Sequence, residues 1–295
     1  MAPLFASTLP VFLIAALGWV AARSLRPDVP GYVRLVLYVF VPFLVYDQVA
    51  RAAGGTVALG RFTLAYLLAY AGLYLSARLL GRLARLPLPV EKTLVAAAVF
   101  PNSGNMGLSV ALFALGQAGL ERAVIYFLLS TVVLFGFGPV LFRGGGAGPS
   151  LRLLLRLPFV WALLLGLLAA VAGYRLPPVL ARPVSMVGAA AIPMLLVGLG
   201  MQIARTRFRL GGFELLASGV RLLGGPALAA LAAWALGLTG LDRALLVLLS
   251  GMPVAVNTYM LAAEFGGDAD LAARTVAVST VLSFLSIPAV LLWVG

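Results

Sequence analysis

Long apolar runs, separated by short stretches that contain arginine, proline and glycine, occupy most of the chain. A transmembrane helix needs about 20 mostly apolar residues, and ten runs of this kind can be followed from one end of the 295 residues to the other. The pattern therefore predicts an all-α membrane protein with ten transmembrane helices. The expected spans are 3–22, 31–48, 62–83, 91–115, 122–142, 153–174, 183–203, 212–236, 243–264 and 271–294.

Composition narrows the class of protein further. Hydrophobic residues make up 63% and charged residues 10%, against roughly 45–50% and 25% in an ordinary soluble domain, which excludes a water-soluble globule. The run 3–22 has no Lys or Arg before it and is followed by Arg23 and Arg26. Since a secretory signal carries its positive charge on the other side, we expect this run to be the first membrane helix.

The two halves of the chain repeat each other. Five residues of the first half recur 149 positions later, and Pro101 and Asn105 recur 152 positions later. A unit of five spans has odd parity, so the second copy must be inverted, as in many secondary transporters. We expect a first repeat in 1–143, a glycine-rich cytoplasmic hinge in 144–150 and an inverted repeat in 151–295. The five matches are Ser130, Thr131, Val132, Phe135 and Pro139 with Ser279, Thr280, Val281, Phe284 and Pro288.

The formal charge of +12 bears on orientation. The cations flank apolar segments instead of forming one basic face, which favours a membrane over a nucleic-acid partner. With the amino terminus outside, the expected inner connections carry fourteen Lys or Arg residues and the outer ones six. Because these residues accumulate on the cytoplasmic side, we expect both termini outside the cell.

Two of the expected spans are interrupted by proline. In the fourth, Pro101 lacks an amide hydrogen, and Gly104 and Gly107 weaken the helix further. In the ninth, Pro253 precedes Asn257 by the same four positions that separate Pro101 from Asn105. Backbone freed at such breaks must face protein, water or a ligand. We expect broken, crossing helices 4 and 9.

Polar side chains gather at these breaks. Two inverted broken helices that cross at the centre would direct the positive ends of the half-helices toward one point, which suits a carboxylate or another small anion. The alternative is that the prolines are packing kinks and the asparagines only join helices. The candidate substrate-binding residues are Asn102, Ser103, Asn105, Asn257 and Thr258.

The sequence resembles the auxin efflux carrier family, which includes plant PIN carriers and bacterial organic-acid permeases. The resemblance is carried by P-N-S-G-N-M-G-L at 101–108, N-T-Y-M-L-A at 257–262 and S-T-V-L-S at 279–283. It implies ten helices with crossing helices 4 and 9, transport of organic anions at the crossing asparagines, a scaffold of helices 1, 2, 6 and 7, and an elevator-like transport unit of helices 3–5 and 8–10. The chain lacks the long central insertion of the plant members, so neither regulation there nor auxin as the substrate is implied.

Charged residues inside the spans are few. Arg221 lies in the eighth span, two turns from Glu214. A charge at this depth is a candidate anion contact, although it can also reach the surface or pair with Glu214. Asp47 and Arg51 have the spacing of a surface ion pair.

These features favour a bacterial inner-membrane transporter that moves small organic anions by alternating access, with efflux as the expected direction. The alternative is a sodium-coupled organic-anion symporter of the bile-acid type. An intramembrane enzyme is disfavoured because the chain has no His or Cys and no pair of aspartates within spans. We expect no cofactor, no metal and no nucleic-acid partner. A passive channel and a homodimer both stay open.

Overall fold

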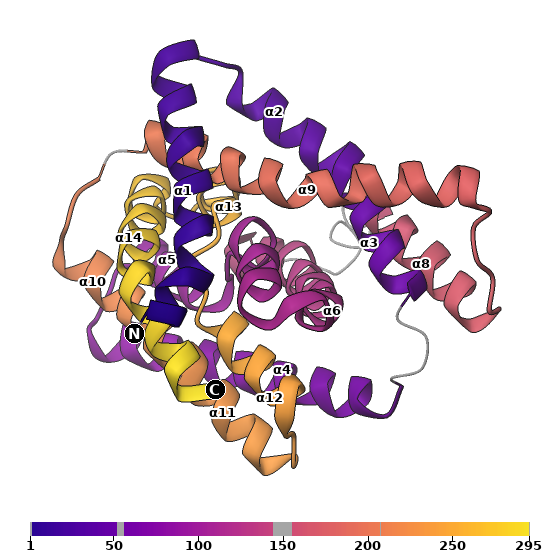
Figure 1. Ribbon diagram of the computed structural model, residues 1–295. Helices are drawn as coiled ribbons and strands as arrows, with labels where there is room; N and C mark the ends of the chain where they lie inside the picture. Colours follow the sequence, from indigo (N-terminus) through magenta and orange to yellow (C-terminus); the bar gives the residue numbers. More distant parts are fainter. Residues whose placement is uncertain (1, 52–55, 144–154, 207, 295) are drawn as a thin grey trace.

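The described part of the chain is helical. The computed structural model describes residues 2–51, 56–143, 155–206 and 208–294 (Figure 1), and within these ranges every regular element is a helix. The prediction of an all-α protein is confirmed. The expected hinge at 144–150 lies outside the described residues.

The α-helices follow the apolar runs of the sequence, and three short π-helical segments lie within or beside them. The α-helices are α1 (Ala2–Leu25), α2 (Val29–Leu35), α3 (Val41–Arg51), α4 (Thr56–Leu83), α5 (Leu88–Val99), α6 (Leu108–Arg143), α8 (Pro158–Val171), α9 (Pro178–Arg205), α10 (Gly212–Gly219), α11 (Gly225–Ala235), α12 (Gly240–Ser250), α13 (Asn257–Phe265) and α14 (Ala269–Val294). The π segments are η1 (Val36–Phe40), η2 (Ser103–Gly107) and η3 (Val220–Gly224).

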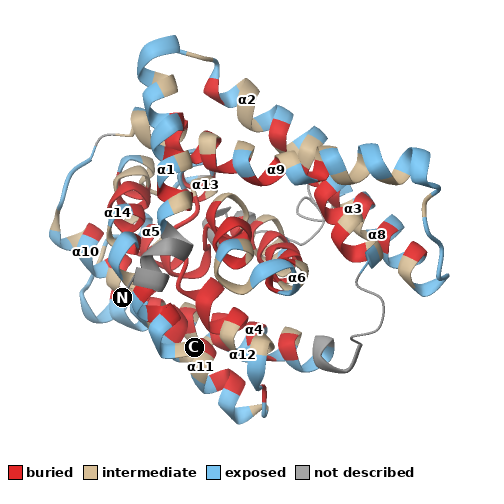
Figure 2. Ribbon diagram, viewed as in Figure 1, coloured by how far each residue is buried: buried red, intermediate tan, exposed pale blue. Residues whose placement is uncertain are grey.

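In the described residues, six helical segments are long and apolar enough to cross a membrane. One of them, Ser103–Gly138, contains Gly116, whose backbone is non-helical with φ 69° and ψ −164°, so it includes parts of two expected spans. Leu9–Leu25 and Pro158–Val171 are shorter apolar helices. The ten-span plan stays a prediction. Figure 2 shows many exposed residues on the outward faces of the helices. Large hydrophobic side chains such as Leu17, Leu168 and Trp234 are among the exposed residues, as lipid contact requires.

The helices pack in two neighbourhoods. In the first, α1 packs against α9, and α3 packs against α8 and α9 (Figure 1). In the second, α4 packs against α5 and α11, α11 against α12, and α14 against α10 and α13. Helix α6 contacts members of both neighbourhoods. It therefore lies between them, and Figure 1 shows it near the centre of the molecule.

Two helices are interrupted inside the second neighbourhood. Helix α5 ends at Val99, Phe100 has extended backbone, and helical structure resumes at Ser103. Helix α12 ends at Ser250, and α13 begins at Asn257 after a non-helical segment that contains Pro253. These interruptions are positioned to expose backbone groups within the protein, and the candidate site is built on them.

Candidate functional site

The two interrupted segments lie against each other and exchange backbone hydrogen bonds. The amide of Asn102 donates to the carbonyl oxygen of Pro253 at 2.7 Å, and the amide of Ala255 donates to that of Phe100 at 2.9 Å. Pro101 and Val254 form an isolated antiparallel bridge. Each break therefore satisfies part of the other's backbone, which removes a cost of several kcal/mol for every bare group in a membrane interior.

The segments that follow the breaks begin with tight backbone geometry. The amide of Gly107 donates to the carbonyl oxygen of Asn102 at 3.0 Å, five residues earlier, which is the hydrogen bond of a π turn. At Gly104, a Cβ atom would lie 2.9 Å from a ring carbon of Phe127. Gly104 therefore permits a close approach of the backbone to α6 that a larger residue would oppose.

A cavity of about 70 Å³ lies at the crossing. This volume accommodates a few water molecules, since one water needs about 10–15 Å³ by this measure. Ser103 begins one helical segment and Asn257 begins another, so two helix amino ends with partial positive charge face the cavity. Its polar lining consists of Asn102, Ser103, Asn105, Ser130, Thr131, Gln202 and Asn257.

Hydrogen-bond donors in the lining differ in how they are satisfied. The side chain of Asn102 is 4% exposed, and its Nδ2 has no hydrogen-bond partner among the described residues. Nδ2 of Asn105 donates to Oε1 of Gln202 at 3.4 Å, which is a long bond. The hydroxyls of Ser103 and Ser130 lie 2.5 Å apart. The unpaired amide of Asn102 is thus the group most in need of an acceptor.

The structure brings four of the five candidate binding residues to this cavity. Asn102, Ser103, Asn105 and Asn257 line it, whereas Thr258 does not. The Thr258 side chain is buried away from the cavity, and its hydroxyl has no hydrogen-bond partner among the described residues. Of the helix-break residues, Pro101 and Gly104 line the cavity, and Pro253 supplies a carbonyl to the crossing.

The cavity also has polar residues that sequence reasoning missed. Gln202 comes from α9, which belongs to the other packing neighbourhood, and Ser130 and Thr131 come from α6. A signal existed for the α6 pair, because these residues recur in the second half as Ser279 and Thr280. For Gln202, the only signal was an amide near the end of an apolar run.

Arg221 lies outside the lining of the cavity. Its side chain is fully buried, and its Nη1 donates to the carbonyl oxygen of Ala98 at 2.5 Å. Its Nη2 donates to the carbonyl oxygen of Ser250. Both alternatives considered for it, exposure at the surface and a pair with Glu214, are wrong, because the guanidinium reaches across to α5 and α12 instead.

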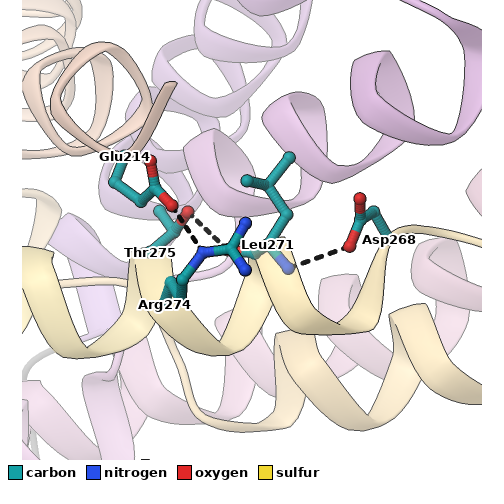
Figure 3. A network of polar contacts seen from close by, with 5 residues as sticks. All are labelled: Glu214, Asp268, Leu271, Arg274 and Thr275. Atoms are coloured by element: carbon teal, nitrogen blue, oxygen red, sulfur yellow. Dashed lines mark hydrogen bonds and ion pairs between the residues drawn. The ribbon is translucent and has the colours of Figure 1, made fainter. Parts of the chain in front are cut away.

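Glu214 has a different partner. Its Oε1 accepts a hydrogen bond from Nε of Arg274 at 2.7 Å, and this ion pair joins α10 to α14 (Figure 3). In the same view, the carboxylate of Asp268 caps α14 by accepting the amide of Leu271 at 2.9 Å. At the end of α3, the expected pair of Asp47 with Arg51 is confirmed at 2.8 Å.

Comparisons with known proteins agree on one class. The model of a family described as "Membrane transport protein" matches residues 3–152 and 147–291. An uncharacterized transporter of Methanothermobacter thermautotrophicus is 32% identical over 199 residues, and one of Methanocaldococcus jannaschii is 25% identical over 201 residues. Each match covers 66% of this chain and 65% of the relative. The chain thus spans slightly less than two thirds of the length of each of these two relatives. A protein of Rhizobium meliloti named "Putative malonate transporter" is 24% identical over an alignment of 311 positions. That alignment covers 99% of this chain and 96% of that protein.

Proposed function

The chain belongs to the membrane transport protein family, which is the auxin efflux carrier family indicated by its motifs, and from this premise we propose that it is a secondary transporter of small organic anions. Short carboxylates are the substrate class, and dicarboxylates such as malonate are the first to test, since a relative that spans nearly the whole chain is named for malonate. Transport proceeds by alternating access, in the direction of efflux.

The observation that carries this proposal is the unpaired amide of Asn102 in a cavity at the crossing. Helix amino ends favour negative charge, and backbone and amide N–H groups bind carboxylates directly. The Asn105 and Asn257 side chains line the same cavity. A carboxylate there would accept hydrogen bonds from neutral donors, so it would need no opposing charge that must be desolvated with it.

The packing of the described helices supports a division into a scaffold and a moving unit. Helices α1, α3, α8 and α9 pack on one another, and α4, α5 and α10–α14 form the second neighbourhood that carries the crossing. Gln202 of α9 lines the cavity from the first neighbourhood. In our proposal, ten spans form two inverted repeats, and movement of the second neighbourhood together with α6 against the first carries the cavity from one side of the inner membrane to the other.

Flux into proteoliposomes tests the proposal. The purified protein is reconstituted, and uptake of a panel of labelled mono- and dicarboxylates, malonate included, is measured against concentration. A carrier gives uptake that saturates and is accelerated by the same anion on the opposite side. Conductance that rises without saturation would indicate a channel, and no flux of any carboxylate would contradict the substrate class.

The sodium-coupled symporter is the competing function, because it shares the plan of inverted repeats with broken helices. The two functions differ in one requirement. A symporter loses flux when choline replaces sodium at a clamped membrane voltage, whereas the uncoupled or proton-coupled carrier proposed here does not.

A further inference from the structure

Arg221 is a fully buried charge close to the middle of the apolar segment Gly212–Ala235. It lies in η3, the π segment that joins α10 to α11. A charge placed inside a membrane protein is costly unless it is paired and hydrogen-bonded. Arg221 takes part in none of the ion pairs Arg51–Asp47, Arg78–Glu91, Arg122–Asp242 and Arg274–Glu214 among the described residues. The groups that stabilise this guanidinium must therefore be dipoles.

Those dipoles are the carboxyl ends of two half-helices. Ala98 is the last residue but one of α5, and Ser250 is the last residue of α12. The guanidinium donates to the carbonyl oxygens of both. These carbonyls lack partners within their own helices, and each helix end has a partial negative charge of about half an electron. One cation therefore serves both interrupted helices.

The surroundings hold Arg221 in this place. The guanidinium carbon lies 5.5 Å from the centre of the Tyr70 ring, within the range of a cation–π contact. Gly225 is also close, since a Cβ there would lie 2.0 Å from the carbonyl oxygen of Ser250 and 2.7 Å from Nη2 of Arg221. The backbone of α11 therefore has to carry glycine where it approaches the guanidinium.

The oxygens around the guanidinium are of the kind that binds small cations. In discontinuous membrane helices, freed carbonyls and the carboxyl ends of half-helices coordinate sodium. Here the carbonyl oxygens of Ala98 and Ser250 face one point, and the hydroxyl of Ser250 lies 3.2 Å from that of Tyr126. A positive side chain of this protein already occupies that point.

We propose that Arg221 is a built-in cation: it neutralises the facing carboxyl ends of α5 and α12 and occupies the position that a sodium ion would otherwise need at the crossing. Arg221 is thus a positioning residue behind the cavity. It binds the carbonyl oxygen of Ala98, which precedes the cavity-lining residues Phe100 and Pro101 by two and three positions. Its consequence for coupling, that anion transport needs no sodium, rests on the proposed function. Its consequence for stability does not.

The test compares thermal stability in two salts. Purified wild type, Arg221→Met and Arg221→Lys are each heated in sodium chloride and in choline chloride of equal ionic strength. Methionine keeps an unbranched side chain as far as the position of Nε but removes the rest of the guanidinium, its charge and every donor, so Arg221→Met should have a lowered Tm in choline that sodium restores in a saturable manner. The wild type and Arg221→Lys should have the same Tm in both salts.

Arg122→Met is the matched control, because Arg122 pairs with Asp242 at 2.5 Å between α6 and α12, away from the two carboxyl ends. The Tm of Arg122→Met should be lowered by the same amount in both salts. A Tm of Arg221→Met that is equal in both salts would overturn the proposal, as would saturable stabilisation of the wild type by sodium. If Arg221→Met cannot be purified in either salt, Arg221→Lys decides: stability in choline supports the built-in cation, and instability there overturns it. If sodium restores the Tm of Arg221→Met but the wild type transports no carboxylate, the built-in cation is supported and only the proposed function is contradicted.

Discussion

Neutral amides, and not charged side chains, supply the side-chain N–H donors of the cavity at the crossing. Asn102, Asn105, Gln202 and Asn257 all line it, and the described lining contains no Lys or Arg. Such donors bind an anion through hydrogen bonds whose strength is about twice that of neutral pairs. In the proposed alternating-access cycle, they would also let the empty site cross the membrane without the cost of moving an unpaired charge.

The first prediction concerns Asn105 and Asn257, which have equivalent positions in the two expected repeats. Asn105→Ala and Asn257→Ala should each weaken carboxylate binding by about ten- to a hundredfold, because a hydrogen bond to a charged group contributes roughly 1.5–3 kcal/mol. Equilibrium binding of labelled malonate to the purified variants measures this. Gln117→Ala is the control, since its amide bonds to Gln48 at 2.9 Å outside the cavity. Unchanged affinity in both asparagine variants would mean that these residues only join helices.

Residue identity predicted the members of the cavity better than the partners of Arg221. Asn102, Ser103, Asn105 and Asn257 stood out because amides and hydroxyls are rare in apolar runs and coincide with proline breaks. The partners of Arg221 are backbone carbonyls of Ala98 and Ser250, and every residue has a carbonyl. Only the approach of α10–α11 to the two helix ends identifies them, so no sequence signal existed.

At the scale of the element, proline accounts for the breaks but not for how they meet. Helix α5 ends before Pro101, as loss of an amide donor requires. The hydrogen bonds between the segments around Pro101 and Pro253 depend on tertiary packing, which a single sequence does not specify. The sequence does not predict the π segment Val36–Phe40 either, because the one extra residue of a π turn leaves an apolar run equally apolar.

Glycine determines how closely α1 and α9 approach, and the second prediction follows from it. A Cβ at Gly200 would lie 1.8 Å from the carbonyl oxygen of Ala15, so Gly200→Ala must push the helices apart. We expect a loss of about 1–3 kcal/mol, as for other overpacked interiors, seen as a lowered Tm in detergent. Gly60→Ala in α4 is the control, because nothing lies within 4 Å of its Cβ position. Equal Tm values for the two variants would contradict the close approach.

At the scale of the whole molecule, the distribution of cations predicts the orientation. The connection between α4 and α5 should face the cytoplasm, and that between α11 and α12 should face outward. Ala84 and Thr239 are exposed there, and the native chain has no cysteine. In intact cells, Thr239→Cys should react with an impermeant maleimide and Ala84→Cys should react only after lysis. The reverse pattern would overturn the orientation.

The second whole-molecule expectation concerns the driving force. Wild-type carboxylate flux should persist when choline replaces sodium, because no acidic residue lies in the described lining of the cavity to help bind sodium. Glu91, the acidic residue of α5, pairs with Arg78 at 3.2 Å. A negative cytoplasm already drives an anion outward with about 2.3 kcal/mol per charge per 100 mV. Flux abolished in choline would instead favour the symporter.

The central claim is that the crossing binds the transported anion, and the most direct test replaces one donor by a negative charge. Asn102→Asp preserves the shape of the side chain and turns the unpaired Nδ2 into a carboxylate oxygen, which repels an anion. Labelled malonate uptake into proteoliposomes is measured for the wild type, for Asn102→Asp and for Gln117→Glu, which makes the same chemical change outside the cavity. The account predicts saturable uptake by the wild type and Gln117→Glu and none by Asn102→Asp. Uptake by Asn102→Asp at the wild-type rate would contradict it.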